Sequence, residues 1–188
     1  AQGVEKVEPD TTCFAFVGDS TFFASAITGV VNAVYNQANM VLIVLDNSTT
    51  AMTGHQPHPG TGQTVMGEIV QKINIEQVLR GIGVTEIETI NPLELEASVS
   101  CVKRMAEKTG VRAIIFKAPC IAVTKPKAPL HVDQDSCIGC KKCIRDLGCP
   151  AIVMNDGKIC IDASMCTGCR LCSQVCPVCA IAGGDDHE

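Results

Sequence analysis

The chain has 188 residues and a mass of 19.8 kDa, which is room for one ordinary domain or two small ones. Hydrophobic residues make up 46% and charged residues 19%, a composition that excludes a disordered chain. A net charge of −5 argues against a nucleic-acid binder, no apolar run approaches the roughly 20 residues that cross a bilayer, and no signal peptide is recognisable. We therefore expect a cytoplasmic protein that is not bound to a membrane.

Short apolar runs alternate with helical patterns over the first 124 residues. The apolar runs predict strands at 13–17, 40–45, 85–90 and 111–117. The helical patterns lie at 22–37, 75–81 and 92–108, and a loop rich in Thr, Gly and Pro covers 48–63. Strands that alternate with helices indicate a parallel sheet, so we predict one α/β domain over residues 1–124.

The composition changes after residue 124. Residues 125–129 contain two prolines and two lysines, which favour an extended, solvated linker. Ten of the 13 cysteines lie between Cys137 and Cys179, whereas all six aromatic residues come before residue 117. We therefore expect a second, small domain at 130–182 that is held together by something other than the packing of large side chains. Residues 183–188 are expected to be a disordered tail.

The cysteine-rich part contains an internal repeat with an offset of 29 residues. Each copy has three cysteines with two residues between neighbours, followed by a Cys-Pro pair. The pattern resembles that of the bacterial two-cluster ferredoxins, in which the fourth cysteine of each run binds the other cluster. The resemblance implies a small α+β domain with two [4Fe–4S] clusters. One cluster would be held by Cys137, Cys140, Cys143 and Cys176, and the other by Cys166, Cys169, Cys172 and Cys149.

Zinc sites and disulfides are the other common uses of grouped cysteines. Structural zinc sites prefer two CxxC pairs separated by a longer gap, and a disulfide framework needs an oxidising compartment. The first copy departs from the ferredoxin spacing, because five residues instead of three separate Cys143 from Cys149. Cys160 is the other candidate for that ligand position. Cys160 and Cys179 are otherwise expected to pack as small hydrophobic residues.

Polar residues follow the first two predicted strands. Gly18-Asp19-Ser20-Thr21 ends the first strand and opens a helix, and Asn47 ends the second strand, 28 residues after Asp19. Amides at a helix N-terminus bind phosphate, and carboxylate and amide oxygens are hard ligands that suit Mg²⁺. This pair alone is a weak signal, because Asp and Asn at such positions commonly cap helices.

The pattern resembles the diphosphate-binding motif of thiamine diphosphate enzymes, which is Gly-Asp-Gly followed by Asn. The segment from Asn47 to Gln56 resembles the loop after the Mg²⁺ ligand in the 2-oxoacid:ferredoxin oxidoreductases. The longer strings that begin at Gly18 and Asp46 are very close to those of the α subunits of indolepyruvate ferredoxin oxidoreductases, and the resemblance spans essentially the whole chain.

The resemblance implies roles for particular residues. Thiamine diphosphate would be bound by Gly18, Asp19, Ser20, Thr21, Asn47 and Thr49. The Mg²⁺ ligands would be the side chains of Asp19 and Asn47 and the backbone carbonyl of Thr49. The residues near the thiazolium ring, with a catalytic role, would be Thr53, Gly54, His55 and Gln56.

The chain departs from the family at several points. Ser20 stands where the motif usually has Gly, and Ala24 stands where the family often has His. If that His assists proton transfer, this chain either lacks the group or uses His55 instead. His58 is a further acid–base candidate, although a His in a loop rich in Gly and Pro is often simply exposed. Thiamine enzymes also use a glutamate from a separate pyrimidine-binding domain, so we expect this chain to be the C-terminal part of a longer subunit.

Together the two halves imply an oxidoreductase. The resemblance implies oxidative decarboxylation of an aryl 2-oxoacid to an acyl-CoA, with coenzyme A as co-substrate and ferredoxin as electron acceptor. The implied partners are a pyrimidine-binding domain or upstream part of the same subunit, a smaller β-type subunit, and an external ferredoxin. Two alternatives remain: an enzyme for pyruvate or a branched-chain 2-oxoacid, and a non-catalytic electron-transfer module, which has no need of Asp19 and Asn47.

Overall fold

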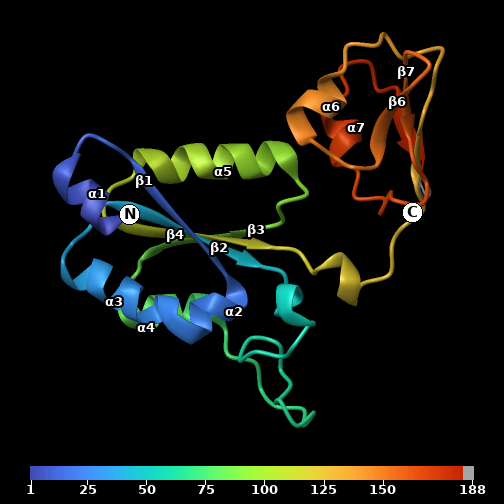
Figure 1. Ribbon diagram of the computed structural model, residues 1–188. Helices are drawn as coiled ribbons and strands as arrows, with labels where there is room; N and C mark the ends of the chain where they lie inside the picture. Colours follow the sequence, from blue (N-terminus) through green and yellow to red (C-terminus); the bar gives the residue numbers. More distant parts are fainter. Residues whose placement is uncertain (184–188) are drawn as a thin grey trace. The chain divides into compact units, whose positions relative to one another are not determined.

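The computed structural model describes residues 1–183, which form two units (Figure 1). The first unit runs from Ala1 to Thr124, and the second begins at Lys125. The division lies at the residue where the linker is expected to begin. No helix of the described part of the chain is both long enough and apolar enough to cross a membrane.

The first unit contains a four-stranded parallel sheet with the strand order β1-β2-β4-β3. Its strands are β1 (Cys13–Gly18), β2 (Met40–Asp46), β3 (Glu86–Ile90) and β4 (Val111–Lys117). Its helices are α1 (Gln2–Val7), α2 (Asp19–Thr21), α3 (Ile27–Tyr35), α4 (Ile75–Ile82) and α5 (Leu95–Glu107). Helix α5 covers one face of the sheet, and α2, α3 and α4 cover the other (Figure 1). The α/β prediction is confirmed, and the apolar runs predict each strand to within one residue at either end.

Each face of the sheet has its own hydrophobic core. Leu42 and Val44 of β2 pack in the cluster that contains Phe22 and Leu79, on the side of α3 and α4. Val41 and Ile43 point the other way and pack with the α5 residues Cys101 and Met105. Burial on both faces explains why β2 reads as a continuous apolar run rather than an alternating one.

The predicted helix at 22–37 is wrong at its start. Helical backbone begins at Asp19, directly after β1, and a π-helical turn at Phe22–Ala26 precedes α3. Such a turn inserts one residue into an α-helix and is frequent at functional sites, but apolar periodicity does not reveal it. The helix α1 was not predicted either. The loop after β2 also runs further than 63, to Asn74, whose side chain caps α4 by accepting from the Gln77 amide at 3.1 Å.

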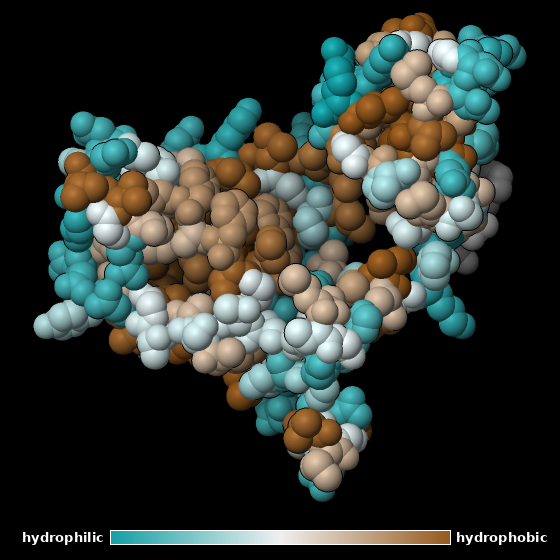
Figure 2. Space-filling model, in the orientation of Figure 1, coloured by the Kyte–Doolittle hydropathy of each residue, from teal (hydrophilic) through white to brown (hydrophobic). Residues whose placement is uncertain are grey.

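Part of this long loop folds back on itself. Gln63 and Ile69 pair across it as an isolated antiparallel bridge, and the Gln63 side chain donates to the carbonyl of Gly67 at 3.2 Å. The tip exposes the apolar side chains of Val65, Met66 and Ile69. Brown atoms mark this tip at the bottom of Figure 2.

The second unit is built from two short antiparallel pairs and two short helices. Strand β5 (Leu130–Val132) pairs with β8 (Ile181–Gly183), and β6 (Ile152–Asn155) pairs with β7 (Lys158–Ile161). The helices are α6 (Lys142–Leu147) and α7 (Leu171–Val175). This is the α+β architecture that the ferredoxin resemblance implies. The predicted tail at 183–188 lies outside the described residues except for Gly183, which is the last residue of β8 rather than part of a disordered segment.

Candidate functional site

Buried polar residues lie where β1 and β2 end. Asp19 is the first residue of α2 and is only 2% exposed, Asn47 follows β2 directly, and Thr49 is 4% exposed. Because β1 and β2 are parallel neighbours, their carboxyl ends meet at one edge of the sheet. This edge is where open α/β sheets bind ligands. The three predicted Mg²⁺ ligands therefore come from one place in the fold.

Backbone amides order this edge. The two carboxylate oxygens of Asp19 accept hydrogen bonds from the Ser20 amide and the Ser48 amide, each at 2.8 Å. The Ser48 amide also donates to Asp46 Oδ1 at 3.0 Å, and Ser48 has a positive φ of 61°. Asn47 Oδ1 accepts from the Thr49 amide at 3.1 Å. The turn at 46–49 is therefore held by its own acidic and amide side chains.

The Asp19 carboxylate is buried without a lysine or arginine beside it. In residues 1–183, the basic side chain within 4 Å of it is His58, whose Nε2 lies 3.2 Å from Asp19 Oδ2. By contrast, the neighbouring Asp46 pairs with Lys117 at 3.3 Å. A buried carboxylate is costly unless a cation or sufficient hydrogen bonds compensate it. Carboxylate, amide and carbonyl oxygens are the donors that Mg²⁺ prefers, so the residues at this edge fit that ion.

The predicted catalytic residues form one exposed turn. Thr53 Oγ1 donates to Gln56 Oε1 at 2.7 Å, and the Gln56 amide group donates back to the Thr53 carbonyl. Gly54 and His55 both have a positive φ, at 116° and 63°. All four residues are exposed to solvent in this chain. His58, three residues beyond His55, is not the exposed loop residue that the sequence suggests, since it is 8% exposed.

A cavity of about 280 Å³ opens near the carboxyl ends of β2, β3 and β4. Asp46 and Lys117 line it from β2 and β4, Thr89 lines it from β3, and His58 borders it from the loop. The cavity is thus adjacent to the buried residues at the ends of β1 and β2.

In the second unit, four cysteines line a small cavity of about 20 Å³. They are Cys137, Cys140, Cys143 and Cys176. Burial raises the pKa of the Cys143 thiol, and the neighbouring charges of Cys140 and Cys176 raise it further. The four residues are the set that the ferredoxin resemblance assigns to one cluster.

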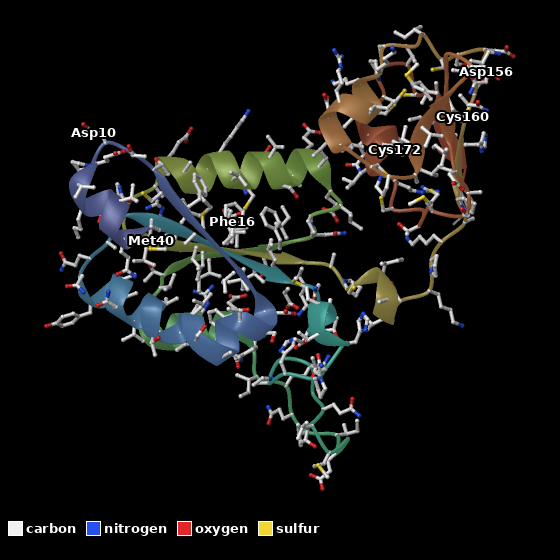
Figure 3. All side chains as sticks on the ribbon, viewed as in Figure 1. Asp10, Phe16, Met40, Asp156, Cys160 and Cys172 are labelled. Carbon is white, nitrogen blue, oxygen red and sulfur yellow. The ribbon has the colours of Figure 1, made fainter. Side chains whose placement is uncertain are left out.

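The other predicted set is also close together. Burial raises the pKa of the Cys172 thiol to about 11, with further contributions from the charges of Cys169, Cys166 and Cys149. Cys149 therefore lies near the second triplet in spite of the longer gap that precedes it. Figure 3 shows Cys172 on α7 and Cys160, the rival candidate, on β7.

Each of these two groups consists of four cysteines, the number of thiolates that a [4Fe–4S] cluster binds. Within residues 1–183, no three His, Cys, Asp or Glu side chains are placed so that they could hold a single metal ion. Backbone amides of Leu130 and Ala180 donate to the sulfurs of Cys166 and Cys176, at 3.5 and 3.3 Å. Such N–H···S bonds tune cluster potentials, so the two sets fit [4Fe–4S] clusters.

The two copies of the repeat also have the same backbone. Gly139 and Gly168 have φ values of 64° and 69°, and the residues two positions later, Lys141 and Arg170, have 60° and 64°. The copies are tied to each other symmetrically: the Asp133 amide donates to the carbonyl of Ala180, and the Asp162 amide donates to that of Ala151, both at 2.8 Å. The offset of 29 residues is therefore a structural repeat.

The cysteines outside the two sets differ in their surroundings. Cys13 and Cys101 are buried, Cys120 and Cys160 are half-buried, and Cys179 is exposed. The expectation that Cys179 packs as a hydrophobic residue is wrong. It lies in the turn after Cys176, with a positive φ of 52° and its amide bonded to the Cys176 carbonyl.

Comparisons with known proteins give the family. Residues 1–116 match the family described as thiamine pyrophosphate enzyme, C-terminal TPP binding domain. The chain is 45% identical over 169 residues to indolepyruvate oxidoreductase subunit IorA of Methanothermobacter thermautotrophicus, and 40% identical over 173 residues to that of Archaeoglobus fulgidus. These matches cover 89% of this chain in both cases, but 27% and 28% of the relatives.

A solved structure shares the fold. The 2-oxoglutarate:ferredoxin oxidoreductase from Magnetococcus marinus, solved with 2-oxoglutarate, coenzyme A and succinyl-CoA bound, superposes with a TM-score of 0.59. The match covers 66% of this chain and 45% of that one at 19% identity, which shows a common fold. The family match covers the sheet and both of its helical faces, including Asp19 and Asn47. The chain therefore belongs to the thiamine pyrophosphate enzymes, through a C-terminal TPP-binding domain at residues 1–116.

Proposed function

We propose that the chain is part of a 2-oxoacid:ferredoxin oxidoreductase that converts an aryl 2-oxoacid, such as indolepyruvate, to an acyl-CoA. The relatives named indolepyruvate oxidoreductase support this assignment, and their greater length leaves room for the further parts that the reaction needs. Those parts are a pyrimidine-binding domain, or upstream part of the same subunit, and a smaller β-type subunit. The buried Asp19 carboxylate, at a sheet edge and without a lysine or arginine, is the single observation that carries the proposal.

In the first unit, the proposed task is to hold the diphosphate of the cofactor. Asp19, Asn47 and the Thr49 carbonyl would bind Mg²⁺, and Gly18, Ser20 and Thr21 would lie beside the diphosphate where the helix begins. When bound, thiamine diphosphate supplies carbanion stabilisation for decarboxylation. The turn at Thr53–Gln56 is the proposed contact of this chain with the reacting ring and substrate.

In the second unit, the proposed task is to accept electrons. One cluster would be held by Cys137, Cys140, Cys143 and Cys176, and the other by Cys166, Cys169, Cys172 and Cys149. When bound, such clusters transfer single electrons, and ferredoxin would be the acceptor outside the enzyme.

The test is cofactor binding by the assembled enzyme, stripped of thiamine diphosphate and kept under anaerobic conditions. Calorimetric titration of the wild type is expected to show thiamine diphosphate binding that depends on Mg²⁺. Asp19→Ala is expected to abolish the Mg²⁺-dependent part, because it removes the charged ligand.

Asp10→Ala is the matched control. Asp10 is exposed and lies before β1, at the opposite end of the strand from Asp19 (Figure 3). It should leave binding unchanged. Equal affinities for the wild type and D19A would mean that the site is misassigned. If the wild type binds no thiamine diphosphate, the electron-transfer module without thiamine chemistry is the better explanation.

A further inference from the structure

His58 occupies an unusual position for a histidine in a loop rich in glycine and proline. It lies between β2 and α4 and is 8% exposed. The Phe23 ring, from the π-helical turn after Asp19, stacks on the imidazole with 5.7 Å between ring centroids and 30° between planes. Packing against Phe23 joins the loop to the segment that carries Asp19.

The loop fixes the orientation of the ring. Thr61 holds the main chain of His58 by three hydrogen bonds. The Thr61 amide and hydroxyl donate to the His58 carbonyl, at 2.9 and 2.8 Å. The Thr61 hydroxyl oxygen also accepts from the His58 amide at 3.3 Å. Gly60 admits no side chain, because a Cβ there would lie 2.9 Å from Phe23 Cε2 and 3.0 Å from His58 Cε1. The ring itself is held by the Gly60 amide, which donates to His58 Nδ1, and by the stacking on Phe23.

The hydrogen bonds of the ring determine which nitrogen carries the proton. His58 Nδ1 accepts from the Gly60 amide at 3.1 Å, so in the neutral ring the proton is on Nε2. Nε2 is buried and 3.2 Å from Asp19 Oδ2, yet its direction does not meet the geometry of a hydrogen bond, and residues 1–183 offer it no other partner. A buried donor without a partner costs free energy, unless a small rotation of the facing carboxylate aligns the two groups.

We propose that His58 is a positioning residue for Asp19: its Nε2–H holds the carboxylate so that an oxygen lone pair faces the divalent cation of the cofactor site. The inference rests on the proposed function, because it concerns the same Mg²⁺ site. The Ser20 amide donates to one carboxylate oxygen of Asp19, and the Ser48 amide donates to the other. The His58 imidazole faces the carboxylate from the loop. Hydrogen-bond partners of metal ligands set ligand orientation, and losing one typically weakens metal binding 10- to 100-fold.

Two substitutions of similar size separate positioning from packing. In His58→Gln, the side-chain amide nitrogen reaches about as far as imidazole Nε2, so it can donate to Asp19. In His58→Asn, the shorter amide nitrogen corresponds to Nδ1 and leaves Asp19 without the donor. Both variants lose the stacking on Phe23, so a purely structural role affects them alike.

The experiment is calorimetric titration of Mg²⁺ into the assembled enzyme at saturating thiamine diphosphate. H58N is expected to raise the Kd for Mg²⁺ by about 10- to 100-fold, and H58Q to restore most of the wild-type affinity. The thermal unfolding midpoint of each variant, measured on the same preparations, shows whether it is folded.

Each outcome has a distinct meaning. If H58N binds Mg²⁺ as tightly as the wild type, or if H58Q is folded and as weak as H58N, the positioning role is refuted and the proposed function stands. If the wild type itself shows no Mg²⁺-dependent binding, the proposed function fails and this inference fails with it.

Discussion

Two glycines in the cysteine loops show how much a single residue constrains this chain. Gly139 and Gly168 hold equivalent places in the repeat, with φ values of 64° and 69°. A Cβ at Gly168 would lie 2.7 Å from both the Ala128 carbonyl oxygen and the Lys127 Cβ, whereas a Cβ at Gly139 would meet nothing within 4 Å. The Lys127 amide also donates to the Thr167 carbonyl at 3.2 Å, so the segment before β5 is bonded beside Gly168. Both glycines therefore have a left-handed backbone, but only Gly168 lies close to a neighbouring segment, Lys127–Ala128.

Replacement by alanine is expected to separate these two effects. Gly139→Ala should cost about 1 kcal/mol of stability, the usual cost of a left-handed backbone for a residue with a Cβ. Gly168→Ala should cost clearly more, because the segment at Lys127–Ala128 must also move away. The measurement is the thermal midpoint of cluster loss in anaerobically reconstituted protein, followed by visible absorbance. Equal midpoints for G139A and G168A would contradict the close approach.

At the scale of elements, the sequence predicts the strands and the repeated cysteine turns, because both depend on short stretches of sequence. The strands follow from apolar runs because burial on both faces of a parallel sheet selects such runs. The equivalent turns of the cysteine repeat follow from its spacing, since each triplet requires the same backbone. The π-helical turn after Asp19 has no such signal, because one inserted residue leaves the apolar pattern nearly unchanged. The contact of His58 with Asp19 could not be predicted either, since it joins residues 39 positions apart through a loop without periodicity.

An ion pair joins α5 to the sheet. Arg104 of α5 donates to Glu88 of β3 at 2.6 Å. The hydrogen bond from Arg104 is the largest cause of a lowered Glu88 pKa, and burial works against it. A carboxylate with a lowered pKa contributes stability that is present above its ordinary pKa of 4.5 and is lost as the pH falls through its folded value.

Glu88→Gln is therefore expected to destabilise α5 at neutral pH and to have no effect in acid. The loss should be below about 1 kcal/mol, because both side chains are partly exposed and water screens the pair. The loss of stability is measured by hydrogen exchange of α5 amides, compared between wild type and variant above and below pH 4.5. Glu86→Gln is the control, because Glu86 lies on the same strand, is more exposed than Glu88 and pairs with Lys108. A Glu88→Gln effect that persists unchanged in acid would show that the charge is not its cause.

At the scale of the molecule, the two units differ in their hydrophobic cores. The first has hydrophobic clusters on both faces of its sheet. The second has no aromatic residue at all, and its buried side chains include Leu130, Ile152, Ile159 and the candidate ligands Cys143 and Cys172. Small domains with little apolar core commonly depend on metal, so we expect the clusters to serve both electron transfer and folding of the second unit.

Iron content tests whether the second unit holds clusters. It also tests whether Cys149 or Cys160 is the fourth ligand of the second set. Anaerobically reconstituted protein should hold about eight iron atoms per chain, as two [4Fe–4S] clusters require. Cys149→Ser should lower the iron content and change the electron paramagnetic resonance signal of one cluster only, because Cys149 lies with the second triplet. Cys160→Ser should leave both unchanged, because Cys160, on β7, is in neither of the two proposed ligand sets. Loss of iron in C160S but not in C149S would reverse the ligand assignment, and about two zinc atoms in place of iron would make the second unit a structural zinc domain.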